Sequence, residues 1–278
     1  NEIASRVGAP GYQKTPIFKK KDRRLFSKKK YEKKVDPTFK KTELNTNVVG
    51  IEAEIDKIRS LLNKITKKNY EEINNKIINA ISFIIKFETE DIEKTLVEIG
   101  TFIFEIGSSN KFLSEIYANL YKKLIDKFNF MKEICEKNFN LYSNLFDNIQ
   151  IVNDSSDYDL FCECNKVNEQ RRSMSCFLSN LINEGVIDPK VMNKLIINLQ
   201  DRIDEKKNNL DKKLEIEEIL ENLYTILVNA HENLSKSAEW SRIYDFIEEI
   251  SEFNSKDYTG LSNKVIFKCV DIIEEIDD

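Results

Sequence analysis

Apolar residues recur at helical spacing along most of this chain. The first clear example lies in residues 58–65, where four apolar residues occupy positions i, i+3, i+4 and i+7. These residues are Ile58, Leu61, Leu62 and Ile65. The pattern stops at the polar run 66–69 and resumes at Tyr70. We therefore predict a short first helix, a polar turn and a second helix.

The same periodicity predicts ten amphipathic helices. Their expected ranges are 50–65, 69–87, 89–106, 110–127, 128–149, 164–185, 188–204, 211–231, 237–252 and 260–276. Two of them have a single continuous apolar face. These faces comprise Val191, Leu195, Ile196 and Leu199 in one helix, and Leu220, Leu223, Leu227 and Val228 in the next. The polar stretch 150–163 interrupts the series and predicts a long surface loop, flexible or functional.

Capping residues stand at many of the expected boundaries. Asp188 precedes a proline that suits the first helical position, and Gly185 suits the end of the helix before it. Further helix starts are expected at Ser109-Asn110, Ser237 and Ser262. In the polar turn 66–69, two caps for the second helix are possible, either Thr66 or a capping box of Asn69 and Glu72.

The composition supports an all-α fold. Seven glycines and four prolines in 278 residues are too few for a protein built from strands and tight turns. Helices of this length joined by short turns form antiparallel pairs. Ten of them make either a large bundle or an α-solenoid of about five HEAT-type pairs. Because the helices are amphipathic and none is apolar all round, we favour the solenoid.

The first 41 residues differ from the rest of the chain. They contain 14 Lys or Arg and four acidic residues, a net charge of +10, so the total of −5 leaves −15 for residues 42–278. The apolar residues of this segment are isolated among lysines, a composition typical of disorder. We predict a disordered basic arm over residues 1–46 and a helical domain over 47–278.

The inventory of reactive groups does not favour an enzyme. His231 is the one histidine, and it suits the C-terminal end of a helix better than a catalytic pair. The sequence contains neither of the glycine motifs that bind phosphates, G-x-x-x-x-G-K-[ST] and G-x-G-x-x-G. Cys162 and Cys164 form a C-x-C pair without a second pair, which favours ordinary thiols over a metal site. We expect no cofactor, no metal and no membrane span, and a cytoplasmic location.

The arm is the expected RNA-binding segment. Its cations can neutralise phosphates, and interleaved aromatic residues such as Phe26 and Tyr31 can stack on unpaired bases. The candidate cations are Lys19, Lys20, Lys21, Arg23, Arg24, Lys28, Lys29 and Lys30. A solvated tail, a localisation signal and nonspecific attraction to polyanions are the alternatives.

Four blocks of sequence resemble a known family. The run IRSLLNKITKKNYEEI, residues 58–73, is similar to the start of the middle domain of eukaryotic translation initiation factor 4 gamma. The matching residues are Arg59, Leu62, Asn63, Lys64, Ile65, Thr66 and Tyr70. Residues 102–124 resemble the second helix pair of that domain, with Phe112 in the turn. Residues 169–188 and 262–277 resemble later helices.

The resemblance is incomplete. The family usually has a proline where this chain has Lys67, and its insertion in the middle of the domain is longer and more highly charged. Related domains occur in mRNA decay, splicing and nuclear cap-binding proteins, so an adaptor or a translational repressor is the alternative. The abundance of Lys, Asn and Ile suggests an AT-rich genome, such as that of a protist or a large DNA virus.

The resemblance implies a HEAT-repeat scaffold of the translation-initiation cap complex that binds a DEAD-box RNA helicase. One end of the solenoid would grip one lobe of the helicase and the other end would touch the second lobe, which favours a half-open state. The implied contact residues are Leu62, Ile65 and Tyr70 at one end, and Lys264, Phe267 and Lys268 at the other. The resemblance further implies a cap-binding subunit, for which Tyr12, Ile17 and Phe18 have the expected spacing. Pro16 disfavours the helix that this motif needs.

Overall fold

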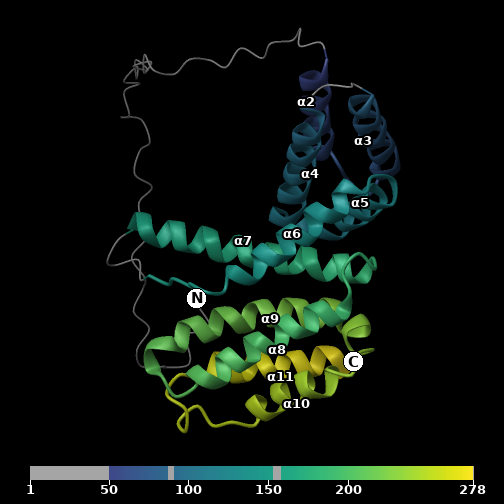
Figure 1. Cartoon of the computed structure of the whole chain (residues 1–278). Helices are drawn as coiled ribbons and strands as arrows, with labels where there is room; N and C mark the ends of the chain where they lie inside the picture. The colour runs from purple at the N-terminus through teal and green to yellow at the C-terminus, as the bar shows by residue number, and fades with distance from the viewer. Residues whose placement is uncertain (1–49, 87–90, 153–157, 278) are drawn as a thin grey trace, which may run out of the picture. The chain divides into compact units, whose positions relative to one another are not determined.

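The computed structural model describes residues 50–86, 91–152 and 158–277. They form ten α-helices and two 3-10 helices, and no strand occurs among them (Figure 1). The helices are α2 (Ile51–Leu62), α3 (Tyr70–Ile85), α4 (Ile92–Ser109), η1 (Lys111–Leu113), α5 (Ser114–Lys127), α6 (Phe130–Asn144), α7 (Tyr158–Asn183), α8 (Pro189–Lys206), η2 (Leu210–Lys212), α9 (Lys213–Leu234), α10 (Trp240–Ser251) and α11 (Asn263–Asp277). The predicted all-α class is confirmed. None of these helices has the length and apolar composition needed to cross a membrane.

The chain divides into two units, Asn1–Thr46 and Asn47–Asp278. All the described helices belong to the second unit. Within it, each helix packs on its successor in five consecutive pairs, from α2 with α3 to α10 with α11.

Alternate helices also pack on one another, which produces two layers. One layer contains α3, α5, α7, α9 and α11, each packed on the next. The other contains α2, α4, α6, α8 and α10, in which α2 packs on α4, α4 on α6 and α8 on α10. Figure 1 shows α9 lying along α7. Stacked helix pairs of this kind are consistent with an α-solenoid.

The polar contacts show that neighbouring helices of one layer run parallel. Contacts between α7 and α9 join residues 47 positions apart at two successive turns. Contacts between α5 and α7 join residues 65 and 66 positions apart. Along α8 and α10, Asn193 contacts Ser237, just before α10, and Gln200 contacts Ile243, so the separations are 44 and 43. A nearly constant separation along a helix pair requires parallel axes, because antiparallel axes would change it by two for every residue.

Several predicted caps are confirmed. The Asp188 carboxylate accepts a hydrogen bond from the backbone N–H of Lys190, at 2.9 Å, and Pro189 occupies the first helical position of α8. Gly185 adopts φ +69° after α7, and the N–H of Val186 donates to the carbonyl of Leu181 at 2.8 Å. This is a Schellman motif, which ends α7 and turns the chain toward α8.

Other starts differ in detail. The Asn110 side chain accepts from the N–H of Leu113 and so caps η1, and Ser262 caps the start of α11. Helix α10 begins at Trp240 with Glu239 at the N-cap position, two residues after Ser237.

The turn between α2 and α3 is closed in a way that the sequence did not predict. Neither Thr66 nor Asn69 places its side chain on the first N–H groups of α3. Instead the Asn69 side chain accepts hydrogen bonds from the N–H and hydroxyl of Thr66 and donates to the carbonyl of Lys64, at 2.8 Å. The two candidate caps, Thr66 and Asn69, thus bond to each other, and hydrogen bonds among residues of the turn stabilise it.

The predicted loop over 150–163 is partly wrong. Helix α7 begins at Tyr158, so residues 158–163 are helical, whereas residues 153–157 lie outside the described ranges. Residues 158–163 are mostly exposed, and Cys164 is the first buried residue of α7. The helix therefore continues through a polar segment whose apolar periodicity is weak.

An aromatic cluster joins the first helices to α7. Phe104 of α4, Tyr121 of α5 and Phe177 of α7 meet edge to face, with ring centroids 5.3–6.0 Å apart. Such geometry is favoured by the ring quadrupoles. Gly107 makes room for the cluster, because a Cβ atom there would lie 3.0 Å from the Phe177 ring. The cluster is buried and lies where α4, α5 and α7 meet.

A buried ion pair joins α7 to α9. Arg171 and Glu218 are 1% and 3% exposed, and their closest N–O distance is 3.3 Å. Arg171 also donates to the Asn168 side chain and twice to the carbonyl of Leu145, which follows the last residue of α6. Glu218 accepts a second ion pair from Arg172. Burial lowers the pKa of Arg171 whereas Glu218 opposes that effect, so the guanidinium stays charged.

Neutral groups extend this network. Ser175 of α7 donates to Asn222 of α9 at 2.7 Å and contacts the Tyr142 hydroxyl of α6 at 2.5 Å. Asn222 donates to the Glu218 carboxylate at 3.1 Å. One connected set of polar groups therefore joins three helices.

We expect Glu218→Gln to lower the free energy of unfolding by about 3–5 kcal/mol, because Arg171 would stay buried without its counter-charge. Urea unfolding followed by circular dichroism measures the change. The matched control is Glu98→Gln, which removes an exposed partner of Arg59, and it should cost less than about 1 kcal/mol. Equal losses in the two variants would contradict the assigned role of the buried pair.

Candidate protein-docking surface

Tyr70 begins α3 and is anchored to α5. Its hydroxyl donates to Asn119 at 2.5 Å, and the Lys123 ammonium lies 4.7 Å from the centre of its ring. Lys123 also forms an ion pair with Glu71 at 2.9 Å. Burial and the neighbouring Glu71 carboxylate raise the pKa of Tyr70, so the phenol remains neutral and can donate. Tyr70 is half-buried, so part of its ring is still accessible to a partner.

Asn119, the partner of Tyr70, also contacts the end of α7. Asn119 donates from its amide nitrogen to Glu184 at 3.3 Å, just beyond the end of α7. Tyr70, Asn119 and Glu184 thus connect three parallel helices of one layer. An exposed ion pair between Lys67 and Glu115, at 3.2 Å, lies beside this chain of contacts.

Leu62 and Ile65 face the core. They are 0% and 2% exposed, and the Tyr117 hydroxyl donates to the carbonyl of Leu62 at 3.0 Å. Their side chains hold the α2–α3 turn against α5 and offer no surface to a partner. The family resemblance implied these two residues as contacts, whereas their apolar periodicity reflects packing in the core.

Phe112 is a further candidate that the predicted set of contact residues did not include. It lies in η1, between α4 and α5, and its side chain is 98% exposed. A groove of about 1040 Å³ beside it is lined by residues 109–112 and by Lys166, Glu169, Gln170 and Ser173 of α7. Aromatic side chains are over-represented among the residues that anchor protein interfaces. Its place in a polar turn, away from any apolar face, was the sequence signal.

The other predicted contacts lie on α11. Phe267 is 65% exposed. Lys264 forms an ion pair with Glu221 of α9 at 3.1 Å, and Lys268 lies 4.2 Å from the centre of the Tyr224 ring. Partial burial opposes ionisation of Glu221, but the hydrogen bond from Lys264 and the charge of Lys268 outweigh it and lower its pKa. The two lysines are thus engaged with α9, and Phe267 is the accessible member of the three.

The remaining predicted residues lie outside the described ranges. They are the RNA-binding candidates Lys19, Lys20, Lys21, Arg23, Arg24, Lys28, Lys29 and Lys30, and the cap-subunit candidates Tyr12, Ile17 and Phe18.

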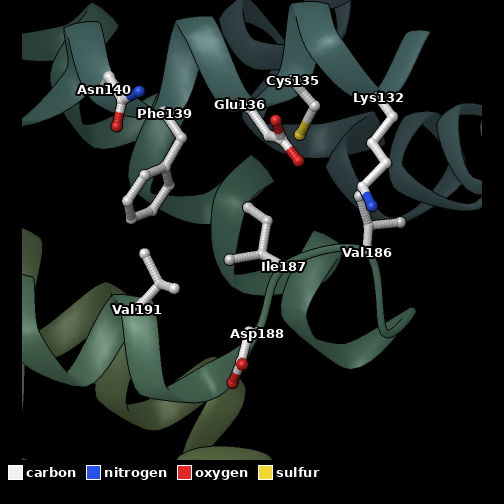
Figure 2. A pocket seen from close by; sticks show the side chains of 9 residues that line it. All are labelled: Lys132, Cys135, Glu136, Phe139, Asn140, Val186, Ile187, Asp188 and Val191. Atoms are coloured by element: carbon white, nitrogen blue, oxygen red, sulfur yellow. The ribbon is translucent and has the colours of Figure 1, made fainter.

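A second groove opens between α6 and α8, with a volume of about 430 Å³. Figure 2 shows Phe139 of α6 and Val191 of α8 facing each other across it, with Ile187 beside them. Val191 belongs to the predicted apolar face of α8, but it is 44% exposed, whereas the other three members of that face are buried. Val191 is exposed because it borders the groove between α6 and α8. At the other end of α8, Arg202 pairs with Asp147 at 2.7 Å.

The cysteines behave as packing thiols. Burial raises the pKa of Cys135 and of Cys269 to about 12, so both thiols stay protonated at neutral pH. Cys162 is exposed and Cys164 is buried, so the two thiols of the C-x-C pair point to different sides of α7. His231 lies in the last turn of α9, with its Nδ1 atom 3.2 Å from the carbonyl oxygen of Val228.

No protein-family model matches this sequence, and a search of curated proteins gives no match.

We expect Tyr70→Phe to destabilise the protein by about 0.5–1.5 kcal/mol, because Asn119 loses its hydrogen-bond donor. Thermal or urea unfolding measures the change. The matched control is Tyr224→Phe, since the Tyr224 hydroxyl makes no hydrogen bond to the described residues and its ring is kept. An equal effect in the control would show that the Tyr70–Asn119 bond contributes nothing.

Proposed function

We propose that this protein is a scaffold of cytoplasmic translation initiation that binds a DEAD-box RNA helicase and RNA, and that it does so without catalysing a reaction. The folded unit would be an α-solenoid of five HEAT-type helix pairs. The proposal rests on the four blocks of family resemblance and is supported by the two-layer stacking of consecutive helix pairs.

The exposure of Phe112 carries the proposal for the helicase contact. The resemblance places a phenylalanine in this turn, and the side chain is free of core packing. The turns that bear Tyr70 and Phe112 lie at the same ends of two parallel helices, α3 and α5. The ion pair of Lys67 with Glu115 joins the same two regions. Both aromatic rings could therefore contact one partner surface.

Phe267 would form the weaker contact at the far end. It stands on α11, the last helix of the same layer, and is separated from α3 by α5, α7 and α9. A helicase whose two lobes touched both positions would favour the conformation that allows both contacts. The scaffold would then raise helicase turnover by shifting a population.

We expect the protein to bind a translation-initiation DEAD-box helicase and to raise its RNA-stimulated ATPase rate, while showing no ATPase activity alone. Phe112→Ala should weaken helicase binding at least about tenfold, because exposed aromatic anchors contribute much of an interface's affinity. Isothermal titration calorimetry measures the affinity, and a coupled assay measures the rate.

The matched control is Leu210→Ala. Leu210 is 65% exposed and lies in η2, which precedes α9 as η1 precedes α5. The Leu210→Ala variant should leave the affinity for the helicase unchanged. Failure to bind any initiation helicase would refute the central proposal. Binding to a helicase of mRNA decay or splicing would favour the adaptor alternative.

Tyr12, Ile17 and Phe18 remain a prediction for the contact with the cap-binding subunit.

The basic arm is the proposed RNA-binding segment. Replacing the eight candidate cations of the arm with glutamine should weaken binding to single-stranded RNA and flatten the salt dependence of that binding, because each lost phosphate contact removes about 0.7 from the slope of log affinity against log salt concentration. Replacing Phe18, Phe26 and Tyr31 with leucine should weaken binding with the slope unchanged. Filter binding at several salt concentrations measures both, and an unchanged slope in the glutamine variant would exclude the arm.

A further inference from the structure

A polar groove of about 810 Å³ lies between α8 and α10. Four carboxylates line it, together with one arginine and one lysine. Arg242 pairs with Asp201 at 2.6 Å, and Lys207 pairs with Asp204 at 2.6 Å. Asp245 and Glu249 remain, and neither forms an ion pair within the described part of the chain. Asp245 accepts a hydrogen bond from Ser241 at 3.2 Å, and Glu249 is near enough to Lys207 to help Asp204 raise the pKa of that lysine. Four carboxylates against two cations still leave the lining of the groove with a net charge of −2.

These two carboxylates are unfavourably placed in α10 itself. They are four residues apart, so they lie on the same face of the helix and repel each other. Glu249 is in the last turn, and Glu252 stands at the C-cap position. The last turn of α10 contains no basic residue, although the C-terminal end of a helix favours positive charge. A bound cation would relieve both effects.

A second observation in the same groove indicates a missing hydrogen-bond donor. Gln200 lines the groove and is 2% exposed. Its amide nitrogen donates to the carbonyl of Ile243 at 2.9 Å, but its Oε1 atom has no partner among the described residues. Buried acceptors of this kind are nearly always hydrogen-bonded in folded proteins. An unpartnered acceptor beside unbalanced carboxylates calls for a ligand that is both cationic and rich in N–H donors.

The remaining lining suits the stem of an arginine. Phe246 is half-buried, lines the groove and lies on α10 between the two carboxylates. Its ring offers an apolar face and a negative quadrupole, which guanidinium groups favour. A guanidinium has five N–H donors, enough for two carboxylates and an amide oxygen.

We propose that the α8–α10 groove binds an arginine-bearing segment of a partner polypeptide, through Asp245, Glu249 and Gln200 with the arginine stem on Phe246. The site is separate from the proposed helicase contacts and does not depend on the proposed function.

The test uses the full-length protein and a fluorescent peptide of arginine, glycine and serine. The same peptide with citrulline in place of arginine is the matched ligand, since citrulline keeps the shape and lacks the charge. Fluorescence anisotropy at low and physiological ionic strength gives the affinities. Asp245→Asn/Glu249→Gln should weaken the arginine peptide about tenfold, and the citrulline peptide should bind far more weakly to the unmodified protein.

The control variant Glu274→Gln/Glu275→Gln makes the same change of net charge on α11 and should alter affinity less than about twofold. Gln200→Met keeps the length of the side chain, removes the acceptor and should weaken the peptide further, with circular dichroism to confirm folding. Equal losses in the two double variants, no loss in either, or equal binding of the citrulline peptide would each overturn the proposal. Helicase affinity should be unchanged in Asp245→Asn/Glu249→Gln, and Phe112→Ala should not affect the peptide, so the two proposals can fail separately.

Discussion

Arg171 is the point at which three helices meet. Its guanidinium is buried between the carboxylate of Glu218 on α9 and the carbonyl of Leu145 at the end of α6. A charge in such a place is tolerated only when its partners are correctly positioned, so any slip between α7 and α9 would leave it unpaired. The separation of 47 positions that Arg171 and Glu218 establish is repeated by Ser175 and Asn222 one turn later. The buried pair therefore sets the register in which α7 and α9 stack.

That register determines what the rest of the layer can present. Because neighbouring helices are parallel, equivalent turns gather at the same ends of the helices. Tyr70 therefore lies beside α5. In the turn before α11, Gly260 lies very close to three backbone carbonyl oxygens that follow or end α8, those of Lys206, Lys207 and Asn209. A Cβ atom on Gly260 would lie 2.6–2.9 Å from those oxygens, so only glycine fits without displacement of the backbone. Surfaces at the turns thus follow from packing deep in the layers.

Some candidate docking residues are buried and others are exposed, and a sequence pattern does not separate the two groups. Periodicity identifies the apolar face of a helix, but it does not distinguish a residue that packs inside from one that meets a partner. Leu62 and Ile65 follow that pattern and are buried, whereas Val191 belongs to an equally regular pattern and is exposed. Phe112 and Phe267 are distinguished from these packing residues by their exposure. The groove between α8 and α10 could not be predicted at all, because its carboxylates come from helices about 40 residues apart.

By itself the sequence determined the helical class, the ten α-helices and several of their caps, because these depend on residues a few positions apart. Asp188 with Pro189 and Gly185 with its positive φ are of this kind. It also determined the contrast between a basic arm and an acidic helical domain, which is a matter of composition. Tertiary structure alone decided the groove between α6 and α8 and the burial of Arg171 against Glu218. Both depend on contacts between distant segments, whose energies local spacing does not encode. The early start of α7 and the closure of the first turn by Asn69 are local features that apolar periodicity does not report.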